Sequence, residues 1–358
     1  MTAQLADGAA CPKQSTSTAA TMPWEHQSLE LTRAARISQG AGVKVGVVDT
    51  GVATGAATLA GRVHAVGSAG EDCVGHGTFV AGLIAAAQAK GVAFHGVAPR
   101  ATIIAARGTT ERGVPSAAGV AAGIRGAVDA GARVVEVSAA FDTRSAQLDA
   151  AVAYAAKHDA LVVAAAVPDP PSGTAGTTTP GPRDYWPAAA RGVLSVLDVD
   201  VQGAHPDTML LPVHADLAAP GDGVVGIGPR GSGHFVGSGA SFAAAYTAGA
   251  AALVRSVFPD LSAAEVARRL TSTAYPDDVP RLDIYAAVAS VMNGTKAVRA
   301  GAGADDGAVR LPDRTQGERA TRTALLVCAV GAGVVLLVGW AAVAVPRGRA
   351  RGWNPPRR

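Results

Sequence analysis

Three residues in separate segments have the types that nucleophilic catalysis needs. Asp49 ends an apolar run, His76 lies between two glycines where an apolar helical stretch begins, and Ser241 follows a glycine-rich turn before another such stretch. A serine becomes a nucleophile when a histidine takes its proton, and a buried carboxylate fixes the tautomer of that histidine and stabilises the imidazolium. Together these three residues predict acyl-transfer chemistry.

Each residue taken alone also has an ordinary structural explanation. An Asp after a strand is commonly a turn residue, and a Ser at the start of a helix is commonly its N-cap. A single His more often forms hydrogen bonds in a core or at a surface. The catalytic interpretation therefore requires a fold that brings residues 49, 76 and 241 together.

The stretch over residues 23–292 alternates short β-branched runs with Ala-rich helical stretches. The runs cover residues 43–49, 101–107, 132–138, 161–167 and 192–199. Continuous apolar runs of this length are typical of strands buried on both faces, and the alternation predicts an α/β fold, a parallel sheet with helices on both faces. Because the carboxyl ends of parallel strands converge on one edge, residues far apart in sequence can meet there.

Composition excludes several classes of protein. Hydrophobic residues make up 49% of the 358 residues and only three are cysteines, which excludes a disordered chain and a small fold built on disulfides. The formal net charge is +3, but its positive excess lies after residue 292, so the body has no basic stripe and we expect no nucleic-acid partner. Isolated acidic pairs lack the spacing of a cation site, and we expect no metal and no cofactor.

The C-terminal part has the pattern of a membrane anchor. Residues 323–345 carry no charged side chain, and an arginine-rich tail follows over 346–358. As a helix the run spans about 34 Å, against about 30 Å for the hydrocarbon core of a bilayer. We expect one transmembrane helix there rather than a buried core helix, preceded by a flexible tether over 293–322.

The arginine-rich tail also predicts a topology. The positive-inside rule places the tail in the cytoplasm and the residues before the membrane helix outside. Residues 1–23 show no signal-peptide pattern, so either export depends on a start further upstream or the protein is tail-anchored with its body in the cytoplasm. The charge rule favours the first, and we expect a single-pass cell-membrane protein with an extracytoplasmic body.

Five segments, in order and spacing, resemble the conserved blocks of subtilisin-like (S8) serine proteases. They are VVDTGV around Asp49, GHGTFVAGLIA around His76, GVAPRATI at 96–103, LAAPG at 217–221 and GASFAAAYTAGAAALV around Ser241. A leading segment from Pro23 to Asp49, a Cys three residues before His76 and the C-terminal membrane helix further resemble the mycosins, the membrane-anchored proteases associated with type VII secretion in actinobacteria.

The resemblance implies a subtilisin-like peptidase domain over residues 23–292, after a leader over residues 1–22. It implies that Asp49 orients His76, that His76 takes the proton of Ser241 and returns it to the leaving amine, and that Ser241 forms the acyl-enzyme.

The resemblance also implies a disulfide. Cys11 and Cys73 match the N-terminal disulfide of the mycosins, which would hold the leader beside the active site. A disulfide requires an oxidising compartment, in agreement with an exported body. The alternative is two free thiols.

One departure from the family pattern affects catalysis. Subtilisin-like enzymes complete the oxyanion hole with the side-chain amide of an Asn, and Pro168 stands at the matching position in VVAAAVPD. Proline has no side-chain donor and no backbone N–H. The backbone N–H of Ser241, at the start of a buried helix, would remain as a donor.

Two functions follow from these observations. The first is a membrane-anchored serine endopeptidase that cleaves a protein or peptide substrate, weakened by the loss of the Asn. The second is a catalytically impaired pseudoprotease that serves as a structural component among the type VII secretion membrane components. An esterase or lipase fits poorly, because the Gly-x-Ser-x-Gly pattern is absent at Ser241.

Overall fold

The protein is described here as a computed structural model. It describes residues 3–170, 181–206 and 210–291, together with residue 340 and residues 344–348 and 350–352. The chain divides into two compact units, Met1–Val291 and Met292–Arg358.

The predicted tether lies outside the described residues, and so does most of the predicted membrane helix over residues 323–345. Among the helices that the structure describes, none combines the length and the apolar character needed to cross a membrane. The membrane helix therefore stays a prediction from the sequence.

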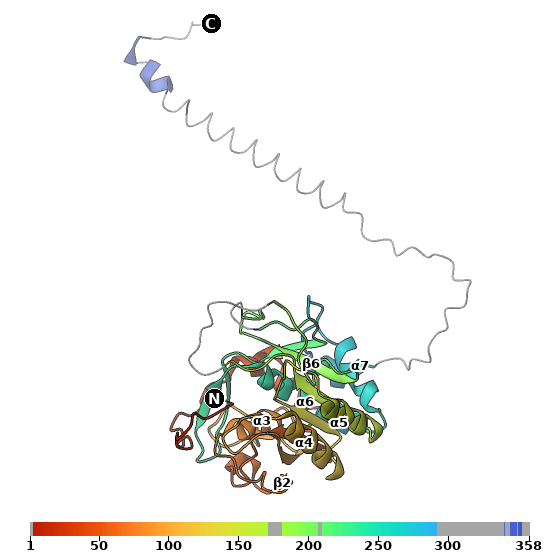
Figure 1. Ribbon diagram of the computed structural model, residues 1–358. Helices are drawn as coiled ribbons and strands as arrows, with labels where there is room; N and C mark the ends of the chain where they lie inside the picture. Colours follow the sequence, from red (N-terminus) through yellow and green to blue (C-terminus); the bar gives the residue numbers. More distant parts are fainter. Residues whose placement is uncertain are drawn as a thin grey trace, which may run out of the picture. The chain divides into compact units, whose positions relative to one another are not determined.

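A seven-stranded parallel sheet forms the centre of the first unit (Figure 1). Its spatial order is β2-β3-β1-β4-β5-β6-β7, and every neighbouring pair is parallel. The strands are β1 (Lys44–Asp49), β2 (Val63–Ala65), β3 (Thr102–Arg107), β4 (Val134–Val137), β5 (Leu161–Ala165), β6 (Val193–Val199) and β7 (Leu217–Pro220). All five strands predicted from the sequence are present, and β2 and β7 add the two edges.

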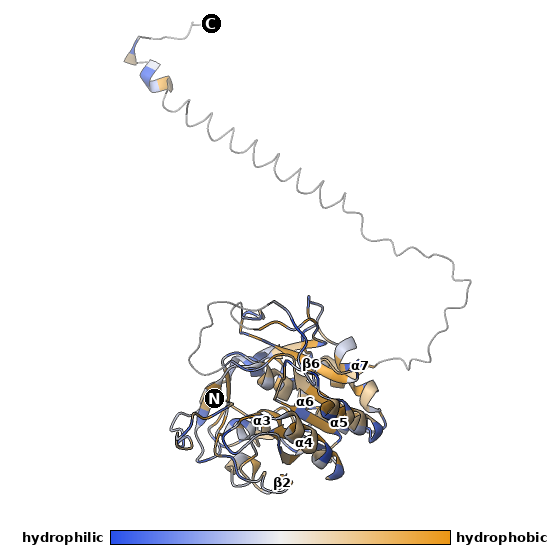
Figure 2. Ribbon diagram, in the orientation of Figure 1, coloured by the Kyte–Doolittle hydropathy of each residue, from blue (hydrophilic) through white to orange (hydrophobic). Residues whose placement is uncertain are grey.

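Helices cover both faces of the sheet, as predicted. Successive residues of β1 point to opposite faces of the sheet. Val47 packs on the face covered by α3 (His76–Ala85) and α6 (Ala240–Val257). Val48 packs on the other face, which is covered by α4 (Ala117–Asp129) and α5 (Ala146–Lys157). The sheet strands are coloured as hydrophobic in Figure 2, and the outer ends of the helices are more hydrophilic. This arrangement excludes water from the interior on both sides of the sheet.

The helix α6 is buried along nearly its whole length. Every residue from Ala240 to Arg255 is buried, and most of them are Ala or Gly. Small side chains allow the helix to pack closely against both the sheet and α3. Ser241 is thereby held at the start of a helix that cannot shift without disturbing the core.

The remaining elements surround this framework. They are α1 (Trp24–Ser28), α2 (Leu31–Ala34), the 3₁₀ helix η1 (Ala57–Leu59), the antiparallel strands β8 (Val224–Ile227) and β9 (His234–Gly237), α7 (Ala263–Ser272) and α8 (Ile284–Ala289).

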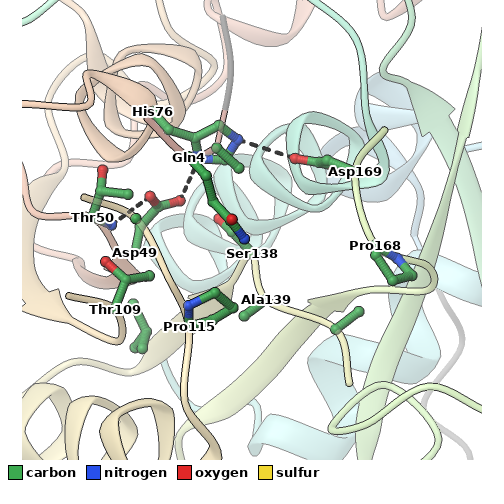
Figure 3. Close-up of a pocket in the computed structure, with 14 residues that line it drawn as sticks. Gln4, Asp49, Thr50, His76, Thr109, Pro115, Ser138, Ala139, Pro168 and Asp169 are labelled. Atoms are coloured by element: carbon green, nitrogen blue, oxygen red, sulfur yellow. Dashed lines mark hydrogen bonds and ion pairs between the residues drawn. The ribbon is translucent and has the colours of Figure 1, made fainter. Parts of the chain in front are cut away.

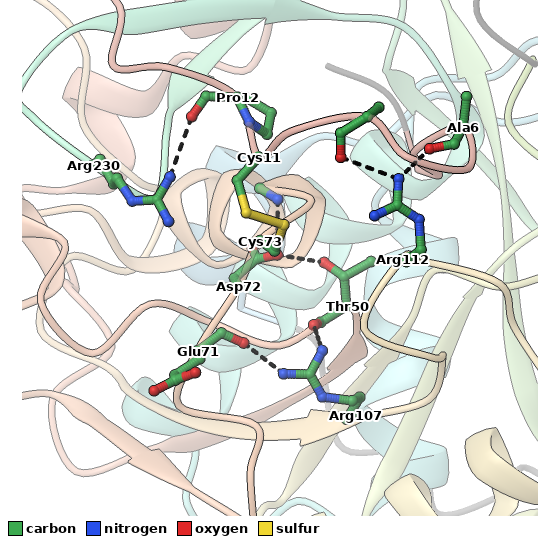
Figure 4. Close-up of a disulfide and its surroundings, with 12 residues drawn as sticks. Ala6, Cys11, Pro12, Thr50, Glu71, Asp72, Cys73, Arg107, Arg112 and Arg230 are labelled. Carbon is green, nitrogen blue, oxygen red and sulfur yellow. Dashed lines mark hydrogen bonds between the residues drawn. A yellow bond between two sulfur atoms is a disulfide. The ribbon is translucent and has the colours of Figure 1, made fainter.

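A disulfide joins the leader to the loop before α3 (Figure 4). Cys11 and Cys73 are bonded, with 4.9 Å between their Cα atoms and a sequence separation of 62. The leader makes further contacts with the domain: the Leu5 N–H donates to the carbonyl of Arg112 at 2.9 Å, and Arg230 donates to the carbonyl of Pro12 at 3.4 Å. The pairing implied by the resemblance is present, and the leader lies against the peptidase domain.

The disulfide is expected to stabilise the domain by restricting the unfolded chain. Loop-closure entropy for a loop of this size corresponds to about 4 kcal/mol. Replacing Cys11→Ser or Cys73→Ser should therefore lower the free energy of unfolding by about 2–4 kcal/mol, measured by chemical denaturation of the purified chain. Reduction of the unmodified protein should give the same change. An unfolding midpoint that does not respond to reductant would contradict the prediction.

Candidate active site

The three predicted catalytic residues meet at the carboxyl edge of the sheet. Asp49 is the last residue of β1, His76 the first of α3 and Ser241 the second of α6. The His76 Nδ1 lies 2.8 Å from Asp49 Oδ2, and the Ser241 Oγ lies 3.2 Å from His76 Nε2. All three residues are buried, with exposed fractions of 3% or less. A nucleophile, a base and an orienting carboxylate are thus connected in one hydrogen-bonded series.

Charge and burial oppose each other within this series. Burial disfavours the charged imidazolium, but the attraction of Asp49 and the carboxylate of Asp169 outweigh it and raise the pKa of His76 well above its ordinary value. Burial likewise disfavours the Asp49 carboxylate, yet the charge and hydrogen bond of His76 lower the pKa of Asp49 overall. The ion pair between Asp49 and the protonated His76 is therefore favoured.

A second buried carboxylate, Asp72, positions the turn that carries His76. The Asp72 Oδ1 accepts hydrogen bonds from the Thr50 hydroxyl at 2.9 Å and the Gly75 N–H at 2.7 Å. Its Oδ2 accepts from both the N–H and the hydroxyl of Thr78, at 2.8 and 2.7 Å. Asp72 thereby ties the end of β1 to the first turn of α3. The sequence analysis did not single out Asp72, which adjoins Cys73.

Close backbone approach explains the glycine after His76. A Cβ on Gly77 would lie 2.1 Å from the carbonyl oxygen of Gly51, so any side chain there would force β1 and α3 apart. The glycine keeps the imidazole of His76 beside the carboxylate of Asp49.

Asp169 is a fourth polar residue at the site, and the sequence analysis missed it. Its Oδ2 lies 3.0 Å from His76 Nε2 (Figure 3) and accepts a hydrogen bond from the Ser241 hydroxyl at 2.5 Å. Its Oδ1 accepts a hydrogen bond from the Ser241 backbone N–H at 3.0 Å. Pro168 was predicted at the oxyanion position, but the side chain that accepts the Ser241 N–H belongs to the next residue, Asp169. The N–H predicted to be the remaining donor is thus already engaged by a carboxylate.

The fit of Asp169 depends on a glycine. A Cβ on Gly239 would lie 2.1 Å from Asp169 Oδ1, so only a residue without a side chain leaves room for the carboxyl group. Only 9% of the Asp169 side chain is exposed. The carboxyl group is held in place from several sides.

Comparison with known proteins identifies the family. The profile of the subtilase family (Peptidase_S8) matches residues 40–318.

The protein belongs to the subtilisin-like serine proteases.

Its similarity to individual proteins narrows this assignment to the mycosins. The chain is 34% identical to Mycosin-4 of Mycobacterium tuberculosis over 91% of its own length and 82% of that protein. The structure of MycP1 from the ESX-1 type VII secretion system matches 82% of the chain and 93% of MycP1, with a TM-score of 0.70 and 26% identity. The periplasmic assembly of the ESX-5 inner membrane complex matches 87% of this chain and 98% of that one, with a TM-score of 0.70 and 27% identity.

A pocket of about 150 Å³ opens beside Asp49 and His76 in this mycosin-like domain. Asp49 and His76 line it, and Pro168 and Asp169 form another part of its wall (Figure 3). Ala3 and Gln4 of the leader also line the pocket, so the leader reaches the catalytic centre. Among the residues that the structure describes, no cluster of three or more His, Cys, Asp or Glu side chains is arranged to hold a metal ion.

A further acid, Glu136, lies behind the pocket on β4 and was also missed by the sequence analysis. It is fully buried, and its Oε1 accepts a hydrogen bond from the Ser138 hydroxyl at 2.8 Å. Burial, and secondarily the charge of Asp49, raise the pKa of Glu136 well above its ordinary value. Burial therefore favours the uncharged form of Glu136 over its carboxylate.

The network around Asp72 predicts a structural effect of substitution. Asp72→Ala leaves four buried donors without their acceptor and should lower the free energy of unfolding by about 2–4 kcal/mol, measured by chemical denaturation. Asp72→Asn retains one acceptor oxygen, so its free energy of unfolding should fall by less than that of Asp72→Ala. The matched control is Asp184→Asn at an exposed position, which should change stability by less than about 0.5 kcal/mol. Equal stability of Asp72→Ala and the control would show that the network does not hold the turn.

Proposed function

We propose that the protein is a membrane-anchored serine endopeptidase of the mycosin type, whose peptidase domain cleaves a protein or peptide substrate outside the cytoplasm. The observation that carries the proposal is the buried series of hydrogen bonds from Asp49 through His76 to Ser241. Substrate enters at the carboxyl edge of the sheet, where the pocket beside His76 opens.

In the proposed reaction the Ser241 Oγ attacks the scissile carbonyl carbon while its proton passes to His76 Nε2. The imidazolium is stabilised by Asp49 and then donates that proton to the leaving amine, which breaks the C–N bond and leaves an acyl-enzyme. Water, deprotonated by His76, then hydrolyses the acyl-enzyme.

Several observations support an extracytoplasmic location with type VII secretion membrane components as partners. The similarity to Mycosin-4 and to the ESX-5 periplasmic assembly connects the chain to such systems. The Cys11–Cys73 disulfide requires an oxidising compartment. The predicted membrane helix over 323–345 and the arginine-rich tail after it agree with this topology.

The Asp169 carboxyl group favours a second candidate, the pseudoprotease. Its Oδ1 accepts the Ser241 N–H, which is the donor that an oxyanion needs. One oxyanion donor contributes about 10²–10³ in turnover, a figure measured on subtilisin itself. If the carboxylate blocks this position permanently, the domain would serve as a structural component of the secretion membrane complex.

A fluorophosphonate probe separates the two functions. The purified full chain should be labelled at Ser241, because an activated serine attacks the phosphorus centre of the probe. Labelling should disappear in Ser241→Ala and His76→Ala, and Asp49→Asn should slow it about 10⁴-fold, as the loss of the orienting carboxylate does in related chemistry. The readout is gel fluorescence together with mass spectrometry of the labelled peptide.

The control is the heat-denatured chain, which should not be labelled. Absence of labelling in the native chain at every pH from about 5 to about 9 would contradict the peptidase function and leave the structural one.

A further inference from the structure

The Ser241 hydroxyl, the His76 Nε2 and the Asp169 Oδ2 form a triangle of atoms within 3.2 Å of one another. On the opposite side of the ring, the His76 Nδ1 lies 2.8 Å from Asp49, so the Nδ1–H donates to Asp49. A neutral imidazole has only one N–H, and its other nitrogen repels a carboxylate oxygen. A contact of 3.0 Å between Nε2 and Asp169 therefore requires one further proton between them.

This proton can reside on either partner. In one form His76 is an imidazolium and Asp169 a carboxylate, and in the other His76 is neutral and Asp169 is a carboxylic acid. The two forms contain the same atoms and the same total charge, so they differ only in the position of one proton.

We propose that Asp169 is a fourth catalytic residue, which takes the shared proton from His76 and, as a carboxylic acid, donates a hydrogen bond to the substrate carbonyl oxygen. This inference rests on the proposed peptidase function. It assigns Asp169 the role that the absent Asn side chain has in the family. A protonated aspartic acid is a competent donor in an oxyanion hole.

The proton balance of acylation supports this role. When the proton moves from Nε2 to Asp169 Oδ2, Nε2 regains the lone pair that accepts the Ser241 proton. The neutral Asp169 releases the Ser241 hydroxyl, which turns to Nε2, and the Ser241 N–H, which turns to the substrate carbonyl oxygen. The Ser241 Oγ then bonds to the carbonyl carbon, and the carbonyl π electrons move to its oxygen, which accepts hydrogen bonds from the Ser241 N–H and the Asp169 O–H. Collapse of the tetrahedral intermediate returns the electron pair and breaks the C–N bond, as His76 passes its proton to the leaving nitrogen.

Other carboxyl groups lie on the elements packed around the pair. Asp49 on β1 bonds the far side of the ring, Asp72 lies in the turn before α3, and burial raises the pKa of Glu136 on β4. The α6 helix contributes the polar groups of Ser241 and no charged side chain in its first turns. The negative charges of Asp49 and Asp169 retain the shared proton, in agreement with the raised pKa of His76.

Catalysis therefore requires that His76 Nε2 and Asp169 carry one proton between them, rather than two or none. Loss of the proton in alkaline solution leaves Asp169 as an anion bonded to the Ser241 N–H, where it occupies the place of the oxyanion. Addition of a second proton in acid leaves His76 as an imidazolium, which cannot act as a base. The reaction rate should rise and then fall as pH increases.

The test compares pH profiles of the full chain and of Asp169→Asn, using the second-order rate constant for fluorophosphonate labelling of Ser241 from about pH 5 to about pH 9. The unmodified chain should lose activity in the alkaline range. Asp169→Asn provides an amide donor that does not titrate, so its rate should level off and exceed that of the unmodified chain by about 10²–10³ in the alkaline range.

Two further variants complete the design. Asp169→Ala removes both the negative charge and the donor. Its labelling rate should therefore not fall in the alkaline range, but should be about 10²–10³ below that of Asp169→Asn. Asp142→Asn, at an exposed position, removes one negative charge away from the triad and should keep the profile of the unmodified chain. If Asp169→Asn does not fold, a labelling rate of Asp169→Ala that does not fall in the alkaline range also supports the inference.

Three outcomes overturn the inference. Parallel profiles for the unmodified chain and Asp169→Asn would show that Asp169 holds no catalytic proton, while the peptidase function stands. Labelling of Asp169→Asn but never of the unmodified chain would show that the carboxyl group only blocks the site. Absence of labelling in both would refute the peptidase function together with the inference.

Discussion

Two carboxyl groups and one serine surround a single buried imidazole, and the rest of the structure serves to hold them there. Asp49 contacts one nitrogen of His76, and Asp169 and Ser241 contact the other. Charges in a low-dielectric interior attract strongly but cost free energy to desolvate, so such a cluster persists only where hydrogen bonds satisfy its remaining atoms. The donors of Thr50 and of the Ser241 backbone meet this requirement for the two carboxyl groups.

The fold meets the geometric part of the requirement through its parallel sheet. The carboxyl ends of β1 and β5 carry or lead to the two carboxyl groups, and α3 and α6 begin at the same edge with His76 and Ser241. Because α6 is buried on all sides, the serine is as fixed as the core itself. Hydrogen bonds to Asp72 hold the turn before α3, and the disulfide of the adjoining Cys73 connects that turn to the leader. The same loop therefore contacts the leader and positions His76.

The same contacts account for both proposed functions. A carboxylate bonded to the Ser241 N–H excludes an oxyanion, whereas a carboxylic acid that releases this N–H and donates its own O–H would stabilise one. The difference between an impaired and a competent site is therefore a single proton on the pair of His76 and Asp169. Among the solved relatives of the chain is a periplasmic assembly of a secretion complex.

The sequence by itself determined five of the seven strands of the sheet, the helical stretches between them and the choice of Asp49, His76 and Ser241, because these depend on local apolar patterns and on short motifs. The identity of the group that accepts the Ser241 N–H depends on the path of the folded backbone instead. Matching VVAAAVPD to the family pattern led to Pro168, whereas the folded backbone presents the next side chain, Asp169, to Ser241. Asp72 and Glu136 were likewise recognisable only after folding, since an acidic residue has no local signature of burial. The tertiary structure decided these positions because side-chain direction and desolvation arise from contacts between distant segments, such as the space that Gly239 leaves for the Asp169 carboxyl group.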